Sequence, residues 1–139
     1  MIRLKLSTIA IILLIFSCNS EKKNPVNQKD FTASYIAGKV VYNDLCITCH
    51  LDNGEGVTKV FPPLANSDFL KNNQTKSIKG LKYGMNEVIV VNGITYNTNM
   101  AALGLTNNEI ADVMNYINNS WENNFGSFIT PEEVLKIAP

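Results

Sequence analysis

The chain has 139 residues, with 12 Lys and Arg side chains against 12 Asp and Glu and a single histidine. This length allows no more than one ordinary domain once a leader is removed. No basic stripe is present in the sequence, which argues against a nucleic-acid partner.

The first residues have the pattern of a secretory signal peptide. Arg3 and Lys5 precede an apolar run at residues 9–16, and Ser17 supplies a small residue before Cys18. The run is too short to span a bilayer as a stable helix, although an uncleaved N-terminal anchor is the alternative. We therefore expect residues 1–17 to be a leader and the remainder to be exported.

Cys18 suggests how the exported chain is held. Residues 14–18 resemble a bacterial lipobox, whose cysteine becomes the acylated first residue of a lipoprotein, although Phe16 stands where a smaller residue is usual. The alternative is a stray cysteine that is discarded with the leader. Residues 18–31 are polar and have the composition of a linker. We expect a flexible tether, lipid-anchored to a bacterial membrane on the periplasmic side, that carries a domain at residues 32–139.

A helix is predicted from about residue 32 into residues 46–50. Its apolar residues recur at helical spacing, and these are Ile36, Val40, Val41 and Leu45. Gly38 and Tyr42 precede Cys46 at steps of four, so these three residues share one face of the helix.

Residues 46–50 read Cys-Ile-Thr-Cys-His and define the chemistry of the chain. A disulfide between Cys46 and Cys49 would close too short a loop to constrain the unfolded chain. A thioredoxin-like site would need parallel-strand runs around it, and a zinc site would need a fourth ligand. Covalent haem attachment uses both thiols and the following histidine.

The spacing fits a porphyrin. Cys46 and Cys49 share a helix face and can add to two vinyl groups on one porphyrin edge, while His50 brings its imidazole under the iron. Because His50 is the only histidine, it is the expected proximal ligand, and a second haem is excluded. Met85 and Met100 are the open candidates for the sixth ligand, since Met114 falls on the apolar stripe of a later helix.

Three further elements are predicted along the chain. Asn92-Gly93, between two β-branched runs, indicates a hairpin. Thr106 and Thr130 each begin a capping-box pattern and a helix, the second being a short structural flap. The buried stripe of the first of these helices is expected at Ile110, Val113, Met114 and Ile117. Asparagine is plentiful, and we attach no function to it.

Several of these segments together resemble a class I c-type cytochrome. They are the Cys-Ile-Thr-Cys-His motif, Gly54-x-Gly56, Phe61-Pro62-Pro63-Leu64, the Tyr96-Asn97-x-x-Met100 segment and the stretch from Tyr116 to Trp121. The resemblance covers residues 34–137. It implies an all-α fold of three to five helices wrapped around one covalent haem c, with a small hairpin before the methionine loop.

The resemblance also implies roles for individual residues. Met100 would bind the iron, although Ala101 stands where the family commonly has proline. The carbonyl of Pro62 would accept the second ring N–H of His50. Tyr96 and Trp121 are the expected partners of the haem propionates, with plain packing as the alternative.

The function implied is single-electron transfer rather than catalysis, because histidine and methionine together leave no open iron position for a substrate. The expected protein is a monomeric, tethered carrier between respiratory redox partners. Two alternatives are a haem subunit of a terminal oxidase, nitrite reductase or quinoprotein dehydrogenase, and an open-site haem protein with peroxidase-like or sensing activity.

Overall fold

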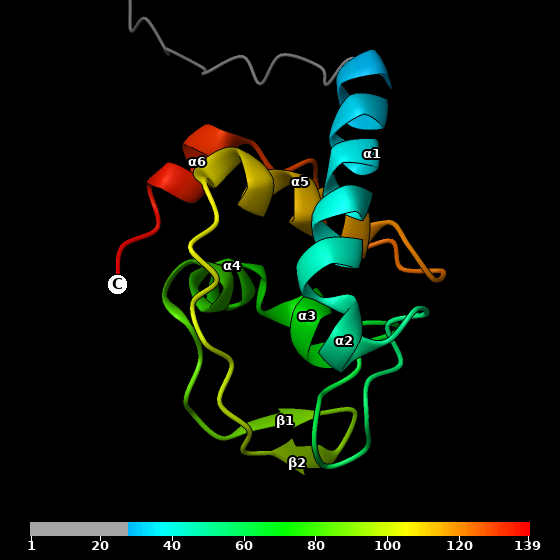
Figure 1. Ribbon diagram of the computed structural model, residues 1–139, viewed down its shortest axis with the longest axis vertical. Helices are drawn as coiled ribbons and strands as arrows, with labels where there is room; N and C mark the ends of the chain where they lie inside the picture. Colours follow the sequence, from blue (N-terminus) through cyan, green and yellow to red (C-terminus); the bar gives the residue numbers. More distant parts are fainter. Residues whose placement is uncertain (1–27) are drawn as a thin grey trace, which may run out of the picture.

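A computed structural model describes residues 28–139 (Figure 1). The predicted leader, Cys18 and most of the predicted tether lie outside the described residues. The elements in chain order are α1 (Gln28–Leu45), α2 (Ile47–His50), α3 (Asp68–Asn72), α4 (Gln74–Tyr83), β1 (Ile89–Val91), β2 (Ile94–Tyr96), α5 (Asn107–Asn118) and α6 (Pro131–Leu135).

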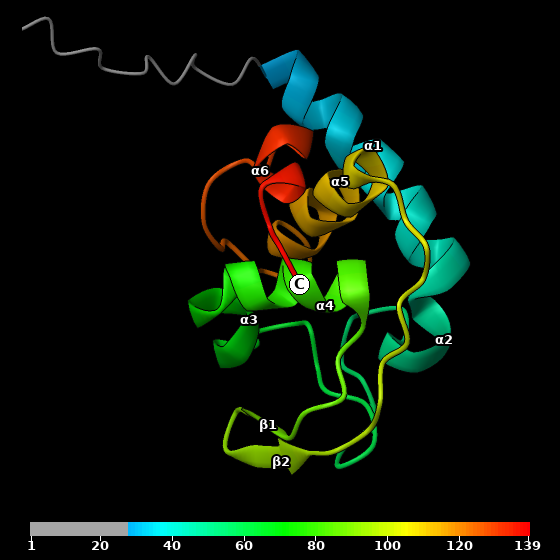
Figure 2. The ribbon, with the colours of Figure 1, turned by 90° about the vertical axis from the view of Figure 1, so that its left-hand side faces the viewer.

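The predicted fold class is confirmed. The described residues form six helices and one antiparallel two-stranded sheet, and three of the helices are only four or five residues long. Helices α1 and α5 pack together at one end of the domain, and α4 lies between α5 and the hairpin (Figures 1 and 2). The short helices account for the difference from the three to five helices expected.

Helix α1 begins at Gln28, so residues 28–31, which were predicted to belong to the tether, are helical. Asp30 lies in the first turn, where a negative charge interacts favourably with the helix dipole. The Thr32 hydroxyl donates to the Gln28 carbonyl at 2.9 Å. The Phe31 ring also packs 6.4 Å from Phe128, between ring centroids, which ties this turn to the domain.

The predicted apolar stripe of α1 is not its buried face. Ile36 is 60% exposed, Val40 56% and Leu45 46%. The buried face instead consists of residues four apart, namely Ser34, Gly38, Tyr42 and Cys46. The spacing of apolar residues predicted the helix correctly, but of the four apolar residues in that prediction only Val41 is partly buried. The face that packs on α5 is the one predicted to hold Gly38, Tyr42 and Cys46 together.

Gly38 is where α1 crosses α5. A Cβ atom at this position would collide with the Asp112 carbonyl and lie 2.8 Å from the Tyr116 Cβ. One turn later, the buried Tyr42 ring packs 5.4 Å from Tyr116 and 5.1 Å from Trp121, between centroids. The small residue and the aromatic together allow close approach of the two helices.

Both predicted capping boxes are present. The Thr106 hydroxyl accepts the N–H of Glu109, whose side chain accepts the Thr106 N–H, and Thr130 and Glu133 repeat the arrangement at α6. The hydrogen bonds to Thr106 lower the pKa of the Glu109 carboxyl. The predicted stripe of α5 is fully buried.

Three asparagines, to which the sequence analysis gave no role, hold the loops around α5. Asn115 donates to Ser34 and exchanges two hydrogen bonds with the backbone of Ile129. Asn118 pairs with the Gln74 amide, and Asn123 donates to the carbonyls of residues 64 and 117. Buried amides therefore satisfy backbone groups that no strand or helix satisfies.

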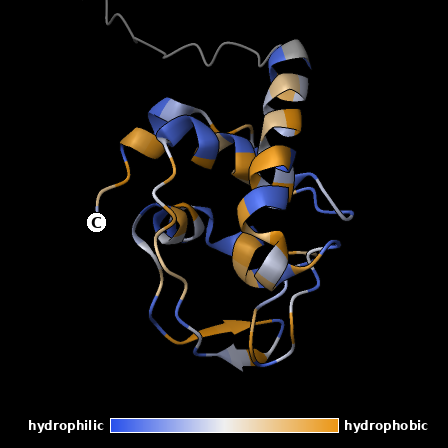
Figure 3. Cartoon of the chain, viewed as in Figure 1, coloured by the Kyte–Doolittle hydropathy of each residue, from blue (hydrophilic) through white to orange (hydrophobic). Residues whose placement is uncertain are grey.

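The predicted hairpin is also confirmed. Asn92 and Gly93 both have positive φ, 50° and 78°, as a two-residue turn of type I′ requires. The Asn92 side chain accepts the Asp68 N–H while the Asp68 carboxylate accepts the Asn92 N–H, which fastens the turn to α3. In Figure 3 β1 is hydrophobic along its length, whereas β2 is mixed.

The Gly38 contact predicts a large effect of a small substitution. Gly38→Ala should lower the free energy of unfolding by about 1–3 kcal/mol through overpacking, despite the better helix propensity of alanine. Guanidinium unfolding followed by circular dichroism measures this. Ala37→Ser, on the exposed side of α1, should change the same quantity by less than about 0.5 kcal/mol, and equal effects would contradict the assigned crossing point.

Candidate functional site

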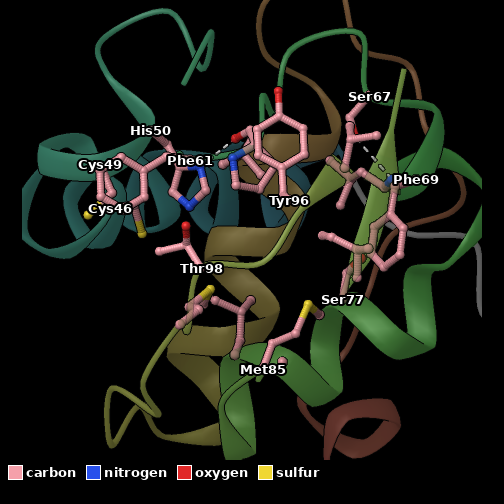
Figure 4. Close-up of a pocket in the computed structure, with 18 of the residues that line it drawn as sticks. Cys46, Cys49, His50, Phe61, Ser67, Phe69, Ser77, Met85, Tyr96 and Thr98 are labelled. Carbon is pink, nitrogen blue, oxygen red and sulfur yellow. Dashed lines mark hydrogen bonds between the residues drawn. The ribbon is translucent and has the colours of Figure 1, made fainter. Parts of the chain in front are cut away.

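A cavity of about 340 Å³ lies between the end of α1, α4, the hairpin and residues 98–103 (Figure 4). Of the seven residues predicted to bind the haem, six line it, namely Cys46, Cys49, His50, Pro62, Tyr96 and Met100. The other lining residues are mostly apolar and come from the end of α1, from α3, α4, β1 and α5, and from the loops at residues 61–67, 85–87 and 98–103. Its size and apolar walls are those of a site for a small molecule or cofactor.

The two thiols lie on one wall, beside the His50 ring (Figure 4). Both are free, Cys46 being buried and Cys49 half-buried. Burial, and secondarily the neighbouring Cys49, raises the pKa of the Cys46 thiol to about 11. Two unbridged thiols one turn apart therefore line the cavity, as expected of an attachment site.

The His50 ring is oriented by the backbone. Its Nδ1 lies 3.0 Å from the Pro62 carbonyl oxygen, the partner predicted for it. Because a carbonyl only accepts, Nδ1 carries the proton and Nε2 keeps its lone pair for a metal. Burial lowers the pKa of His50, and the hydrogen bond to Pro62 acts in the opposite direction with a smaller effect. The ring is thus neutral and positioned as a ligand.

The segment after His50 is folded so that Pro62 reaches the ring. The Tyr42 hydroxyl donates to the Leu51 carbonyl at 2.6 Å, and the Gly56 N–H donates to the His50 carbonyl at 3.0 Å. Gly56 has a φ of 61°, and a Cβ atom there would collide with the Phe61 carbonyl and lie 2.7 Å from the Pro62 oxygen. Gly56 therefore lets the two backbone segments approach closely.

Met85 and Met100 lie next to each other on the cavity wall. Each donates its backbone N–H to the carbonyl of the other at 2.8 Å. Residues paired in this way place their side chains on the same face of the ribbon. Figure 4 shows the Met85 side chain across the cavity from the His50 ring.

Tyr96 lines the cavity with only 3% of its surface exposed, opposite Ile89 in the hairpin. Trp121 does not line it. The Trp121 indole N–H donates to the Asp52 carbonyl at 3.1 Å, and the ring packs against Gly54 and Tyr42. The prediction that Trp121 binds a propionate does not fit this geometry, because its donor already has a backbone partner.

Several lining residues were not singled out from the sequence, among them Phe69, Leu70, Ser77, Gly80 and Leu81. They come from α3 and α4, whose apolar residues carry no motif. Only the folded chain shows that these two helices form one wall of the cavity.

Comparison with known proteins agrees with this site. The family model for cytochrome c matches residues 35–121. The chain belongs to the cytochrome c family. This confirms the resemblance to class I c-type cytochromes, and the cofactor is haem c, bound covalently through Cys46 and Cys49. The free thiols and the apolar cavity beside them fit that group.

Two kinds of relative are similar to this cytochrome. Cytochrome c-552 of Thermus thermophilus is 36% identical over 102 residues, which cover 66% of this chain and 77% of that protein. The cytochrome c subunit of the quinone alcohol dehydrogenase of Gluconobacter oxydans is 29% identical over 110 residues, and the same subunit of Komagataeibacter europaeus is 31% identical over 116. The cytochrome spans only 22% and 23% of the length of these two subunits.

The importance of the close contact between Gly56 and the Pro62 backbone can be tested by comparing substitutions at Gly56 and at a second glycine of this cytochrome. Gly104 also has a positive φ, 69°, but a Cβ atom there would meet nothing within 4 Å. Gly104→Ala should cost about 1 kcal/mol of unfolding free energy from backbone strain alone. Gly56→Ala should cost roughly 2–4 kcal/mol, because overpacking adds to the same strain.

Guanidinium unfolding of the haem-loaded variants measures both costs. Equal losses for Gly56→Ala and Gly104→Ala would contradict the proposed role of Gly56 in bringing Pro62 to His50.

Proposed function

We propose that the chain is a membrane-tethered, mono-haem cytochrome that carries single electrons between respiratory redox partners, with His50 and Met100 as the axial ligands. The family supports electron transfer. The observation that carries the ligand assignment is the cavity itself, which has the oriented His50 ring on one wall and the Met85–Met100 pair on another.

Among the methionines, Met100 has the most suitable surroundings. Met114, on α5, is 1% exposed and packed in the hydrophobic core of the domain. The terminal methyl group of Met85 lies only 2.8 Å from where a Cβ atom of Gly80 would be, so its thioether packs against α4. Met85 and Met100 are both half-buried and fixed to each other by two backbone hydrogen bonds, so the contact of the Met85 methyl group with α4 is what favours Met100 as the ligand. The pairing thus fixes the segment next to Ala101, the position at which the family commonly has proline.

The residues around the cavity suit transfer without bond rearrangement. A haem with histidine and methionine ligands takes up and releases one electron, and the soft thioether favours the reduced state. The Pro62 carbonyl keeps the His50 ring in one orientation, and the apolar walls exclude water from it. With His50 and Met100 both held by their backbones, a bound haem would exchange an electron with little movement of these two residues, and no position would be open for a substrate.

The tether is proposed from the sequence. A leader at residues 1–17, acylation at Cys18 and a polar segment before α1 would hold the domain at a bacterial membrane, facing the periplasm. Within residues 28–139, no helix is long and apolar enough to cross a bilayer.

The ligand assignment predicts different results for two substitutions. Met100→Ala should abolish the weak far-red absorption band of ferric haem that reports a thioether–iron bond. Met85→Ala should keep it, because Met85 only packs beside the ligand. The reverse result would make Met85 the ligand, and absence of the band from the wild-type protein at neutral pH would favour an open-site haem protein.

A second candidate function is a fixed haem subunit of a larger oxidoreductase. The similarity to cytochrome c subunits of quinone alcohol dehydrogenases favours it, although those subunits are several times longer. In this case the same haem would pass electrons within one complex rather than between diffusing partners.

Detergent extraction of membranes separates the two functions. For a tethered carrier, the haem protein should partition with membranes, migrate alone after extraction and become soluble in a Cys18→Ala variant. Stable co-migration with an enzyme would contradict the free carrier and support the subunit. Recovery of the wild-type protein in the soluble fraction would contradict the tether.

A further inference from the structure

The segment at residues 130–137, here called the strap, lies beyond the region matched by the family model, which ends at residue 121. It contains α6 and packs on α5, with Val134 fully buried. The capping box at Thr130 and Glu133 fixes its beginning. The sequence analysis took it as a structural flap without a site.

The end of the strap is held by a side chain of α4. The Lys82 ammonium group lies 3.0 Å from the carbonyl oxygens of Val134 and Ile137 and 3.5 Å from that of Leu135. The last turn of α6 has no basic residue of its own. Because carbonyls at a helix C-terminus attract a cation, the Lys82 ammonium group binds this end from another helix, in addition to Lys136 at the C-cap of α6 itself.

The next residue of α4 contacts the same segment. The Tyr83 hydroxyl donates to the Ile137 carbonyl at 3.0 Å. The last turn of α4 is thus fastened to the strap by two side chains, one of which is half-buried.

The other side of this turn leads directly to Met100. Gly84 follows Tyr83 and lies so close to the next segment that a Cβ atom there would be 3.0 Å from the Met100 carbonyl oxygen. Met85 then pairs with Met100 through both backbone hydrogen bonds. Residues 82–85 are therefore fixed on one side to the strap and on the other to the methionine segment.

We propose that the strap, through Lys82, holds Met100 in position on the iron, so that Lys82 is a positioning residue for the sixth ligand. The proposal rests on the proposed function, in which Met100 is that ligand. Without the ammonium group, the end of α4 loses its attachment to the strap. The Met85–Met100 pair then opens more often, and an external ligand displaces the Met100 sulfur more easily.

The experiment is an imidazole titration of the ferric haem protein, in which imidazole nitrogen replaces thioether sulfur on iron and the far-red band disappears. Lys82→Met keeps an unbranched side chain that is one heavy atom shorter and removes its charge. It should bind imidazole about tenfold more tightly, because the open state is more populated. Lys79→Met, on the exposed side of the same helix, should titrate as the wild type does.

Tyr83→Phe removes a single hydrogen bond and should tighten imidazole binding by a smaller factor. This variant tests the role of the strap if the Lys82→Met protein does not fold with haem attached. If Lys82→Met, or Tyr83→Phe in its place, binds imidazole as the wild type does while Met100→Ala lacks the far-red band, the proposed role of the strap is overturned. If Met100→Ala keeps the band, the ligand assignment itself is wrong, and the strap proposal is overturned with it.

Discussion

The hydrogen bond between the His50 Nδ1 and the Pro62 carbonyl oxygen is the interaction on which the site depends. It sets the tautomer and directs Nε2 into the cavity, while burial lowers the pKa of the ring. The bond requires that the backbone after the motif folds back closely, which Gly56 permits and the Tyr42 hydroxyl assists. Tyr42 in turn is placed by the crossing of α1 and α5, so the helix packing and the ligand geometry are one arrangement.

The domain has little regular structure around its cavity, and polar side chains replace the missing backbone pairing. Asn115 and Asn123 satisfy backbone groups around α5, Asn118 pairs with the Gln74 side chain, and Asp68 and Asn92 attach the hairpin to α3. These bonds matter because buried polar groups left unpaired are costly. They also hold the cavity walls at fixed positions, which favours electron transfer with little rearrangement.

Features encoded by neighbouring residues were predictable from the sequence. The Cys46–His50 motif, the two capping boxes and the Asn92-Gly93 turn depend on contacts within a few residues, and all three were expected. Most long-range contacts were not, although the family resemblance implied the contact of His50 with the Pro62 carbonyl. Which face of α1 is buried depends on α5, and the indole of Trp121 takes Asp52 as its partner. The contribution of α4 to the cavity and the Lys82 contact with α6 likewise appear only in the fold.

The central claim is that one haem is attached permanently to Cys46 and Cys49 beside the oriented His50. The most direct measurement is the intact mass of the protein, matured with a complete haem-attachment system, after denaturation and extraction with acidified acetone. The account predicts a coloured chain that retains the mass of one haem, and a Cys46→Ala, Cys49→Ala double variant that retains none. A colourless wild-type chain with the mass of the polypeptide alone would contradict it.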